Sequence, residues 1–486
     1  MLFNSLPFAA FAAIIAAITA ALAALAPRKD IRNVILLAAS YWFYAQFSPT
    51  FLIILAYVTL LNYVAPLAMQ RRPASARAIT LATVFLTLIP LLTYKYTTFI
   101  LADLLNIDLG DWADSLLLPV GISFYTFQAL SYTIDVFRSK IPARRNPIDV
   151  ALFIAFFPTV LSGPIAKARH LLPQLELPTT FNPANLRTGV TLFIWGLFKK
   201  AVIADRLAAY VNLAYIAPEH QNGATLALAA IFYSIQIYCD FSGYSDMAIG
   251  TAKALGFNLQ RNFRYPYFAT SIKQFWRGWH ISLTTWFTEY VYFSLGGNRV
   301  PKWRWTVNIS LVFLLSGLWH GAATSFLIWG ALHAVLYLIE HYAGLQDKNF
   351  RLPRLATLPA GLIVFLLVTI AWVYFRADNA AIATTIVTRA FTAWTSLPDA
   401  GVSAFTLAIN TALLTLYLLL EWKMYRDETT TPTAPAVPNS QPTIPAAATP
   451  CEDPLIPLRS PLWLAILLLL TALFSVPTDT FVYFQF

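Results

Sequence analysis

The stretch SLVFLLSGLWHGAATSFLIWGALH, residues 310–333, contains no Asp, Glu, Lys or Arg, and its ionisable side chains are His320 and His333. About 20 apolar residues in a helix cross the hydrocarbon core of a bilayer, so the stretch predicts membrane-embedded helix. An ionisable side chain at that depth is costly, usually faces the protein interior, and is a functional hypothesis by default. Imidazole is also the side chain best suited to move a proton near neutral pH. His320 is therefore the first candidate catalytic residue.

The chain as a whole is also rich in hydrophobic residues and poor in charged ones. Of 486 residues, 58% are hydrophobic and 12% are charged, whereas about 25% of the residues in a soluble domain are charged. Alternation with a period of two is absent, which favours helices over a transmembrane barrel. The sequence thus predicts an all-α, polytopic integral membrane protein with roughly eleven to thirteen spans in the lipid bilayer.

The net charge of +10 has two interpretations, nucleic-acid binding and membrane topology. Lys and Arg gather in short loops between apolar runs, so topology is favoured and no nucleic-acid partner is expected. The positive-inside rule places these loops in the cytoplasm and both chain termini on the opposite side. The basic loops contain Arg28, Lys29 and Arg32; Arg71, Arg72 and Arg77; Arg138, Lys140, Arg144 and Arg145; Lys348, Arg351 and Arg354; and Lys423 with Arg426.

Two further segments and the two cysteines bear on the organisation of the chain. Met1–Ala26 is apolar but lacks a basic start and precedes many further spans, so it predicts a retained helix rather than a signal peptide. The two cysteines, Cys239 and Cys451, make neither a disulfide framework nor a metal cluster, and no metal site is expected. Residues 427–459 are rich in Thr, Pro and Ala and predict a flexible cytoplasmic loop.

Residues 261–304 are amphipathic and differ from the apolar runs on either side. They mix the charged residues Lys273, Arg277 and Glu289 with the aromatic residues Trp276, Trp279, Trp286 and Phe287. This pattern predicts helices that lie along the membrane interface or enter it part-way. The alternative is an ordinary aromatic belt beside a cytoplasmic loop. His280 lies in this segment, and it either acts together with His320 or is a hydrogen-bonded structural histidine.

A second polar group lies in an apolar helix at YCDFSGYSD, residues 238–246. Asp240 and Asp246 are six positions apart and lie on different faces of a helix, so they are not an obvious catalytic pair. Either carboxylate caps a broken helix, pairs with Arg277 or orients His320. A structural role is favoured over direct chemistry.

Two segments combine Pro and Gly with hydroxyl side chains inside apolar sequence. PVGISFYTFQ, residues 119–128, ends on the amide of Gln128 and predicts a kinked, closely packed helix. Ser162-Gly163-Pro164 similarly interrupts a span. Because interrupted helices often line cavities, both segments are interpreted as cavity walls rather than reactive groups.

The chain ends on the aromatic cluster FVYFQF, residues 481–486. Tyr and Phe at a membrane interface ordinarily act as anchors. The alternative makes Tyr483 a nucleophile that carries an acyl group in transit, since a phenol with a pKa of about 10 forms a more activated ester than a sugar hydroxyl does.

Three motifs in this order resemble the membrane-bound O-acyltransferase superfamily: FWRGWHISL at 275–283, LGGNR at 295–299 and LWHG at 318–321. The branch that looks most similar is that of the bacterial alginate O-acetylases, and the similarity covers most of the chain. The resemblance implies one domain over residues 1–486, with a ring of helices around a central tunnel. Within it, residues 1–116 are the amino-terminal helices, 117–345 the catalytic core, and 346–426 with 460–486 the carboxy-terminal helices.

The same resemblance implies roles for individual residues. The family's essential histidine matches His320, its supporting histidine matches His280, and an acyl-accepting tyrosine proposed for relatives that acylate envelope polymers matches Tyr483. Gly278 is a departure, because a second basic residue is common at that position. Roles in lining the tunnel or binding the donor are implied for Arg277, Asp240, Ser242, Tyr244, Asp246, Gln128 and Trp319.

The expected activity is transfer of an acyl group, foremost acetyl, from acetyl-CoA or an acyl carrier thioester on the cytoplasmic side of the bacterial inner membrane. The expected acceptor is an exported polysaccharide, with alginate as the first choice. No bound cofactor is expected, and the expected partner is a periplasmic acetyltransferase or polymer-binding protein. Alternatives are another envelope glycan such as peptidoglycan or cellulose, a catalytically silent scaffold, and a proton-coupled transporter, which interior histidines also suit.

Overall fold

The computed structural model describes residues 1–107, 117–178, 180–346, 352–430 and 460–476. Within these residues the chain forms helices and no strand, which confirms the predicted all-α class. The chain divides into two compact units. Unit 1 comprises the described residues of Met1–Gly196, Tyr244–Arg261 and Pro432–Leu464, and unit 2 those of Leu197–Gly243, Asn262–Thr431 and Ala465–Phe486.

Unit 1 is built mainly from the amino-terminal helices. They are α1 (Leu6–Leu25), α2 (Lys29–Ala45), α3 (Pro49–Arg71), η1 (Pro73–Ser75), α4 (Ala76–Thr98), the π-helical turn η2 (Phe99–Leu104), α6 (Ile122–Phe137), α7 (Pro147–Ala155), α8 (Ala168–Glu176) and most of α9 (Pro183–Phe198). Helix α1 begins where Ser5 Oγ accepts a hydrogen bond from the amide of Phe8. This is a regular N-cap, and it confirms the helix predicted within Met1–Ala26.

A buried polar network ties three helices of unit 1 together. Arg32 and Asn33 on α2 both donate to the carbonyl oxygen of Leu175 on α8, at 2.8 and 3.0 Å. Asn33 Nδ2 also donates to Asp149 Oδ1 on α7 at 3.0 Å. Because buried polar groups are costly when left without hydrogen bonds, this network fixes α2, α7 and α8 to one another.

The segment 119–128 departs from its predicted form. The sequence predicted a kinked helix here, but helix α6 begins only after Gly121, whose φ of +77° is left-handed. A Cβ on Gly121 would lie 2.3 Å from the carbonyl oxygen of Val160, closer than real Cβ atoms come. Glycine is therefore required by a close backbone approach at the start of a helix, and a kink within one is the wrong prediction.

Unit 2 contains the segments that carry the two candidate histidines. Its elements are the π-helical turn η3 (Lys199–Ala204), α10 (Asp205–Ile216), the first part of α11 (Gly223–Ala254), η4 (Pro266–Phe268), α12 (Ile272–Gly278), α13 (Ile281–Phe287), the π-helical turn η5 (Thr288–Tyr292), α14 (Lys302–His320), α15 (Thr324–Tyr342), α16 (Arg354–Arg376), α17 (Ala380–Thr392), α18 (Ala404–Thr430) and most of α19 (Pro461–Phe474). Helix α11 runs unbroken through Asp240 and Asp246, which excludes the alternative that either carboxylate caps a broken helix.

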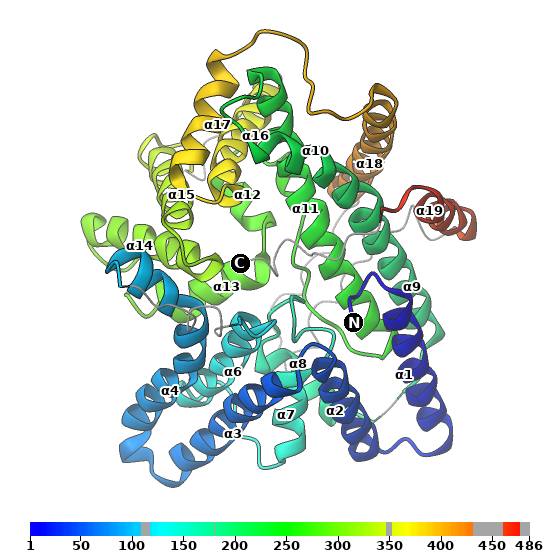
Figure 1. The fold of residues 1–486 in the computed structure, drawn as a ribbon. Helices are drawn as coiled ribbons and strands as arrows, with labels where there is room; N and C mark the ends of the chain where they lie inside the picture. The colour runs from blue at the N-terminus through cyan, green and yellow to red at the C-terminus, as the bar shows by residue number, and fades with distance from the viewer. Residues whose placement is uncertain (108–116, 179, 347–351, 431–459, 477–486) are drawn as a thin grey trace. The chain divides into compact units, whose positions relative to one another are not determined.

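Helices α14 and α15 form a hairpin and lie side by side in unit 2 (Figure 1). A Cβ on Gly317 would lie 2.3 Å from the carbonyl oxygen of Phe326, and one on Gly330 would lie 2.5 Å from that of Phe313. Only glycine allows two backbones this close, and small residues are the usual device by which membrane helices cross. Gly317 lies one turn before His320, so the crossing determines where the histidine is held.

The amphipathic segment contains the two short helices α12 and α13 and the turn η5, so helices are present as predicted. Their position at the membrane interface stays a prediction. Ser271 Oγ accepts from the amide of Gln274 at 3.0 Å at the start of α12. The carboxylate of Glu340 on α15 accepts from the amides of Ile272 at 2.7 Å and Lys273 at 3.0 Å. A carboxylate here satisfies amides that the first turn of a helix leaves without partners, so Glu340 fixes α12 to α15.

Six helices among the described residues are long and apolar enough to cross a membrane, and the chain is a multi-pass membrane protein. They are Leu6–Leu25, Pro49–Arg71, Pro73–Ala102, Gly223–Ala254, Leu355–Arg376 and Ala404–Thr430. The larger predicted number of spans, the ring around a tunnel and the single domain over the whole chain stay predictions. The predicted loop 427–459 is wrong at its start, because α18 extends through Thr430; its residues 431–459 lie outside the described part.

Candidate active site

His320 is the last residue of α14, and only 4% of its surface is exposed. Three aromatic rings surround its imidazole. The ring centroid lies 4.9 Å from that of Trp319, 5.1 Å from that of Trp329 on α15 and 5.1 Å from that of Phe375 on α16. In such a low-polarity enclosure, hydrogen bonds and charges interact more strongly than they do in water.

His280 is the residue immediately before α13 and has a left-handed backbone, φ +41°, which is uncommon for a residue other than glycine and stores strain. Hydrogen bonds to Asn262 hold this turn in place. The amide of Ile281 donates to the Asn262 carbonyl oxygen at 2.8 Å, and Ser282 Oγ donates to Asn262 Oδ1 at 2.9 Å. The centroid of the His280 ring lies 6.3 Å from that of His320. The structure therefore brings together the two histidines that the sequence singled out.

The imidazole of His280 is buried, with 1% of the residue exposed. Its ring also packs edge-on against Phe241, at 4.6 Å between centroids. His280 lies outside the candidate spans, and burial lowers its pKa well below the usual 6.5 because the charged form loses its hydration. A neutral imidazole has one nitrogen that donates and one that accepts. His280 is thus suited to hydrogen bonding or proton transfer rather than to a fixed positive charge.

A steric constraint explains why position 278 is glycine, where the family commonly has a second basic residue. The amide of Arg264 donates to the Gly278 carbonyl oxygen at 2.9 Å, which holds the two backbones together. A Cβ on Gly278 would lie 2.5 Å from the carbonyl oxygen of Arg264. A basic side chain at 278 therefore does not fit this backbone, and of the two positions only Arg277 presents a charge.

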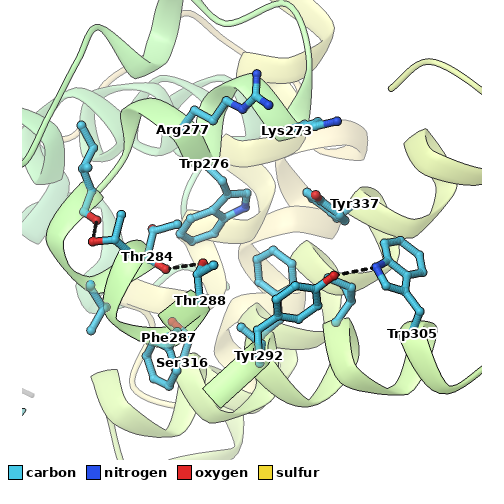
Figure 2. Close-up of a pocket in the computed structure, with 16 residues that line it drawn as sticks. Lys273, Trp276, Arg277, Thr284, Phe287, Thr288, Tyr292, Trp305, Ser316 and Tyr337 are labelled. Carbon is cyan, nitrogen blue, oxygen red and sulfur yellow. Dashed lines mark hydrogen bonds between the residues drawn. The ribbon is translucent and has the colours of Figure 1, made fainter. Parts of the chain in front are cut away.

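A cavity of about 400 Å³ lies between α12, α13, η5, α14 and α15 (Figure 2). Lys273 and Arg277 lie at one edge of it and Ser316 at the opposite edge, with Trp276 between them. Ser316 is one turn before His320 on α14. The other lining residues are apolar or carry a hydroxyl or an indole: Ile281, Leu283, Thr284, Thr285, Phe287, Thr288, Tyr292, Trp305, Ile309, Val312, Phe313 and Tyr337.

Asp240 and Ser242 contact two buried lysines of η3 that the sequence analysis missed. Lys200 Nζ lies 2.6 Å from Asp240 Oδ1 and 2.7 Å from Asp205 Oδ1, and Lys199 Nζ donates to Ser242 Oγ at 2.8 Å. A Lys-Lys pair in a membrane protein suggests a cytoplasmic loop. Residues 197–204, LFKKAVIA, contain no Gly or Pro to form such a loop. Their absence was the signal that could have placed both lysines in a helix.

Three of the predicted tunnel or donor-binding residues belong to unit 1, apart from the unit that contains both histidines. Gln128 is buried, donates to a carbonyl of α7 and accepts from the amide of Ala166 at 3.1 Å. The ring of Tyr244 packs on Phe3, at 4.6 Å between centroids, and Asp246 is half-buried on α11. The hydrogen bonds of Gln128 join α6 to α7 and to the segment that follows α7, which gives it a structural function in the described fold.

Two further histidines of unit 2 pack against aromatic rings. His333 is fully buried, with its ring centroid 4.9 Å from those of both Trp276 and Trp329. His341 packs on Trp305 at 4.2 Å between centroids. Tyr483 lies outside the described residues, so its role stays a prediction. Within the described part of the chain, no group of three His, Cys, Asp or Glu side chains is placed to hold a metal ion.

Two buried histidines beside a cavity with a cationic edge, in a multi-pass membrane protein, form the kind of residue group that marks a candidate active site. The model of the MBOAT, membrane-bound O-acyltransferase, family matches residues 37–377, and the chain belongs to that family. The chain is accordingly an acyltransferase, which confirms the resemblance seen in the sequence.

Known relatives differ in the molecules that their names mention. The probable alginate O-acetylase AlgI of Pseudomonas aeruginosa is 41% identical over 361 residues, 72% of this chain and 68% of that protein. The peptidoglycan O-acetyltransferase of Helicobacter pylori is 34% identical over 375 residues, 71% of each chain. The teichoic acid D-alanyltransferase of Bacillus subtilis is 32% identical over 259 residues, 51% of this chain and 65% of that protein.

Proposed function

We propose that the protein transfers an acetyl group from a cytoplasmic thioester, acetyl-CoA or an acyl carrier, to a hydroxyl group destined for an exported polysaccharide. His320 is the general base and His280 is its supporting histidine. The observation that carries this proposal is the burial of both imidazoles 6.3 Å apart, centroid to centroid, in one aromatic enclosure. Family membership supports acyl transfer over proton-coupled transport as the use of these histidines.

The proposed reaction needs one base that returns its proton. The imidazole of His320 accepts the proton of the attacking hydroxyl as the hydroxyl oxygen bonds to the thioester carbonyl carbon. The C–S bond then breaks, and the leaving thiolate takes the proton from His320 to become the free thiol. A positioned base of this kind contributes about 10²- to 10⁴-fold in rate. The attacking hydroxyl belongs to Tyr483, to a serine of a periplasmic partner or to the sugar itself.

Alginate is the proposed final acceptor, because relatives from several Pseudomonas species that are 40–41% identical are named probable alginate O-acetylases. Peptidoglycan is the second candidate, since the Helicobacter pylori relative is named for it. A periplasmic acetyltransferase or polymer-binding protein is the proposed partner. The alternating basic loops support a bacterial inner-membrane location with both termini in the periplasm.

The role of His320 is tested by His320→Ala in cells that contain no other copy of the enzyme, with hydroxylamine-sensitive acetyl esters measured on the exported polymer. The matched control is His220→Ala, because the His220 side chain is 81% exposed between α10 and α11. We expect normal membrane insertion of both variants, no acetyl esters with His320→Ala and wild-type acetylation with the control. Full acetylation by His320→Ala would overturn the proposal.

The relay through Tyr483 has a separate test. Tyr483→Phe keeps the ring and the anchoring surface but removes the nucleophilic oxygen. Loss of polymer acetylation supports the relay. Wild-type acetylation by this variant rejects it, and the role of His320 then stands with a sugar or serine hydroxyl as the acceptor.

A further inference from the structure

One turn of helix α11 is held by contacts on several sides. Successive side chains of a helix point about 100° apart, so Tyr238, Asp240 and Phe241 face three different directions. The hydroxyl of Tyr238 donates to Glu421 Oε1 on α18, and the carboxylate of Asp240 contacts η3. Phe241 contacts the imidazole of His280, with 4.6 Å between the ring centroids. This turn of α11 therefore joins the histidine to two other elements of unit 2.

The contact between α11 and η3 is a buried ion cluster. Lys200 Nζ lies 2.6 Å from Asp240 Oδ1 and 2.7 Å from Asp205 Oδ1, and each of the three residues is at most 4% exposed. Lys199 Nζ adds a hydrogen bond to Ser242 Oγ at 2.8 Å. Because a buried charge that loses its partner is strongly destabilising, α11 has little freedom to rotate or slide against η3.

Aromatic rings connect the same turn of α11 to the histidine. Phe241 is fully buried, its ring centroid lies 5.0 Å from that of Phe263, and Phe263 stacks on His280 at 6.4 Å. Aromatic pairs prefer defined geometries, and Phe241 is edge-to-face with both of these neighbours. The three rings are therefore packed as a set, in which a shift of Phe241 displaces the imidazole.

His280 needs such support because its backbone is strained, with a φ of +41°. A conformation of this kind persists only where the surrounding structure over-determines it. The hydrogen bonds of Asn262 fix the backbone that follows the histidine, whereas Phe241 and Phe263 contact its ring. The ring of His320 lies 6.3 Å away, centroid to centroid, so a small displacement of the His280 ring alters the spacing of the two imidazoles.

We propose that Lys200 and Asp240 are positioning residues for His280. Their ion pair fixes the turn of α11 that holds Phe241 against the imidazole, and they act on the reaction through that ring. The inference rests on the proposed function, in which His280 supports His320. It gives the buried ion cluster a function in catalysis besides its contribution to stability.

The test is a double-mutant cycle on the full-length protein in proteoliposomes, with release of the free thiol from acetyl-CoA as the measured rate. Asp240→Asn removes the charge and keeps the size of the side chain, while Lys200 retains Asp205 as a partner. We expect kcat to fall about tenfold with the KM for acetyl-CoA unchanged, because a supporting group is displaced. The variant Asp240→Asn/His280→Gln is expected to be no slower than His280→Gln alone. Independent effects multiply, so this non-additivity shows that Asp240 acts through His280.

A second variant and a control accompany the cycle. Phe241→Leu keeps the ion cluster and removes the ring, so it is expected to lower kcat as Asp240→Asn does, and it carries the test where Asp240→Asn fails to fold. The matched control is Asp149→Asn, which removes a buried carboxylate from the network that joins α2, α7 and α8 in unit 1. The control is expected to lower the thermal midpoint and to leave kcat unchanged.

The placement of the imidazole is read separately, by its reaction with diethyl pyrocarbonate followed by peptide mass spectrometry. His280 is 1% exposed, and His220, whose side chain is 81% exposed, serves as the internal reference. We expect slow modification of His280 in the wild type and in Asp149→Asn. In Asp240→Asn and Phe241→Leu we expect modification to be severalfold faster, because the ring is no longer held in its packed position.

The outcomes separate this proposal from the proposed function. Where His280→Gln is slow, the positioning role is overturned by wild-type kcat in Asp240→Asn or Phe241→Leu, or by a double variant whose loss is the product of the single losses. A wild-type rate in His280→Gln rejects the supporting role of His280 in the proposed function. The reaction with diethyl pyrocarbonate then decides the positioning by itself, and unchanged modification of His280 in both variants overturns it.

Discussion

Replacing Gly317 by alanine tests how closely the crossing of α14 and α15 sets the position of His320. The added Cβ would lie 2.3 Å from the carbonyl oxygen of Phe326, about 1 Å inside the 3.4 Å at which ordinary contact begins. Because the obstacle is backbone, the helices must separate, and overpacking of this kind costs about 1–3 kcal/mol. His320 lies one turn further along α14, and a misplacement of 1 Å at a reacting group costs up to about 10²-fold in rate. We expect the variant to insert and to acetylate about 10- to 100-fold more slowly.

The assay pairs acetyl esters on the exported polymer with the thermal midpoint of the detergent-solubilised protein. Gly361→Ala on α16 is the matched control, because its Cβ would lie 3.8 Å from the carbonyl oxygen of Ala269, an ordinary contact. That variant is expected to keep wild-type activity and to gain up to about 1 kcal/mol from helix propensity. Wild-type activity and stability in Gly317→Ala would refute the argument that this crossing positions His320.

Three further changes have defined outcomes. Lys200→Met leaves the buried carboxylates of Asp205 and Asp240 without their shared cation, so we expect a loss of about 3–5 kcal/mol, seen as a lower thermal midpoint; an unchanged midpoint contradicts this. Glu340→Gln weakens the contacts to the first turn of α12 and is expected to cost about 1–2 kcal/mol, whereas exposed Glu219→Gln serves as the control and leaves the midpoint unchanged. His280→Gln is expected to lower the transfer rate without moving the acid limb of the pH–rate profile, because burial lowers the pKa of His280 and keeps it neutral above pH 6.5; a shifted limb argues against a neutral His280.

The sequence predicted the helical membrane class because long uncharged runs such as Leu6–Leu25 have one stable state in a bilayer. It also identified His320, because an ionisable group between uncharged residues calls for an explanation. His280 was identified in the amphipathic segment and through the resemblance carried by FWRGWHISL, residues 275–283. The surroundings of His320 in the fold were not predictable from the residues next to it in the sequence. Its surroundings include Trp329 on α15 and Phe375 on α16, and such pairings depend on how the helices cross.

The partners of the polar side chains were the least predictable part. Asp240 was expected to cap a broken helix, to pair with Arg277 or to orient His320, and the structure instead shows it paired with Lys200, which is forty positions away along the chain. The glycine at 121 signalled a break without saying whether it was a kink or a helix start, because only its contact with Val160 decides that. The cavity similarly joins five separate elements, and no local pattern marks a space between them.

The central claim is that the His320 imidazole is the base in acyl transfer. It is tested most directly in proteoliposomes that contain the purified protein, by following release of the free thiol from acetyl-CoA in the wild type and in His320→Ala, with coenzyme A affinity measured on both. The account predicts release at least about 10²-fold slower in the variant with affinity unchanged. Release at the wild-type rate from His320→Ala would contradict it.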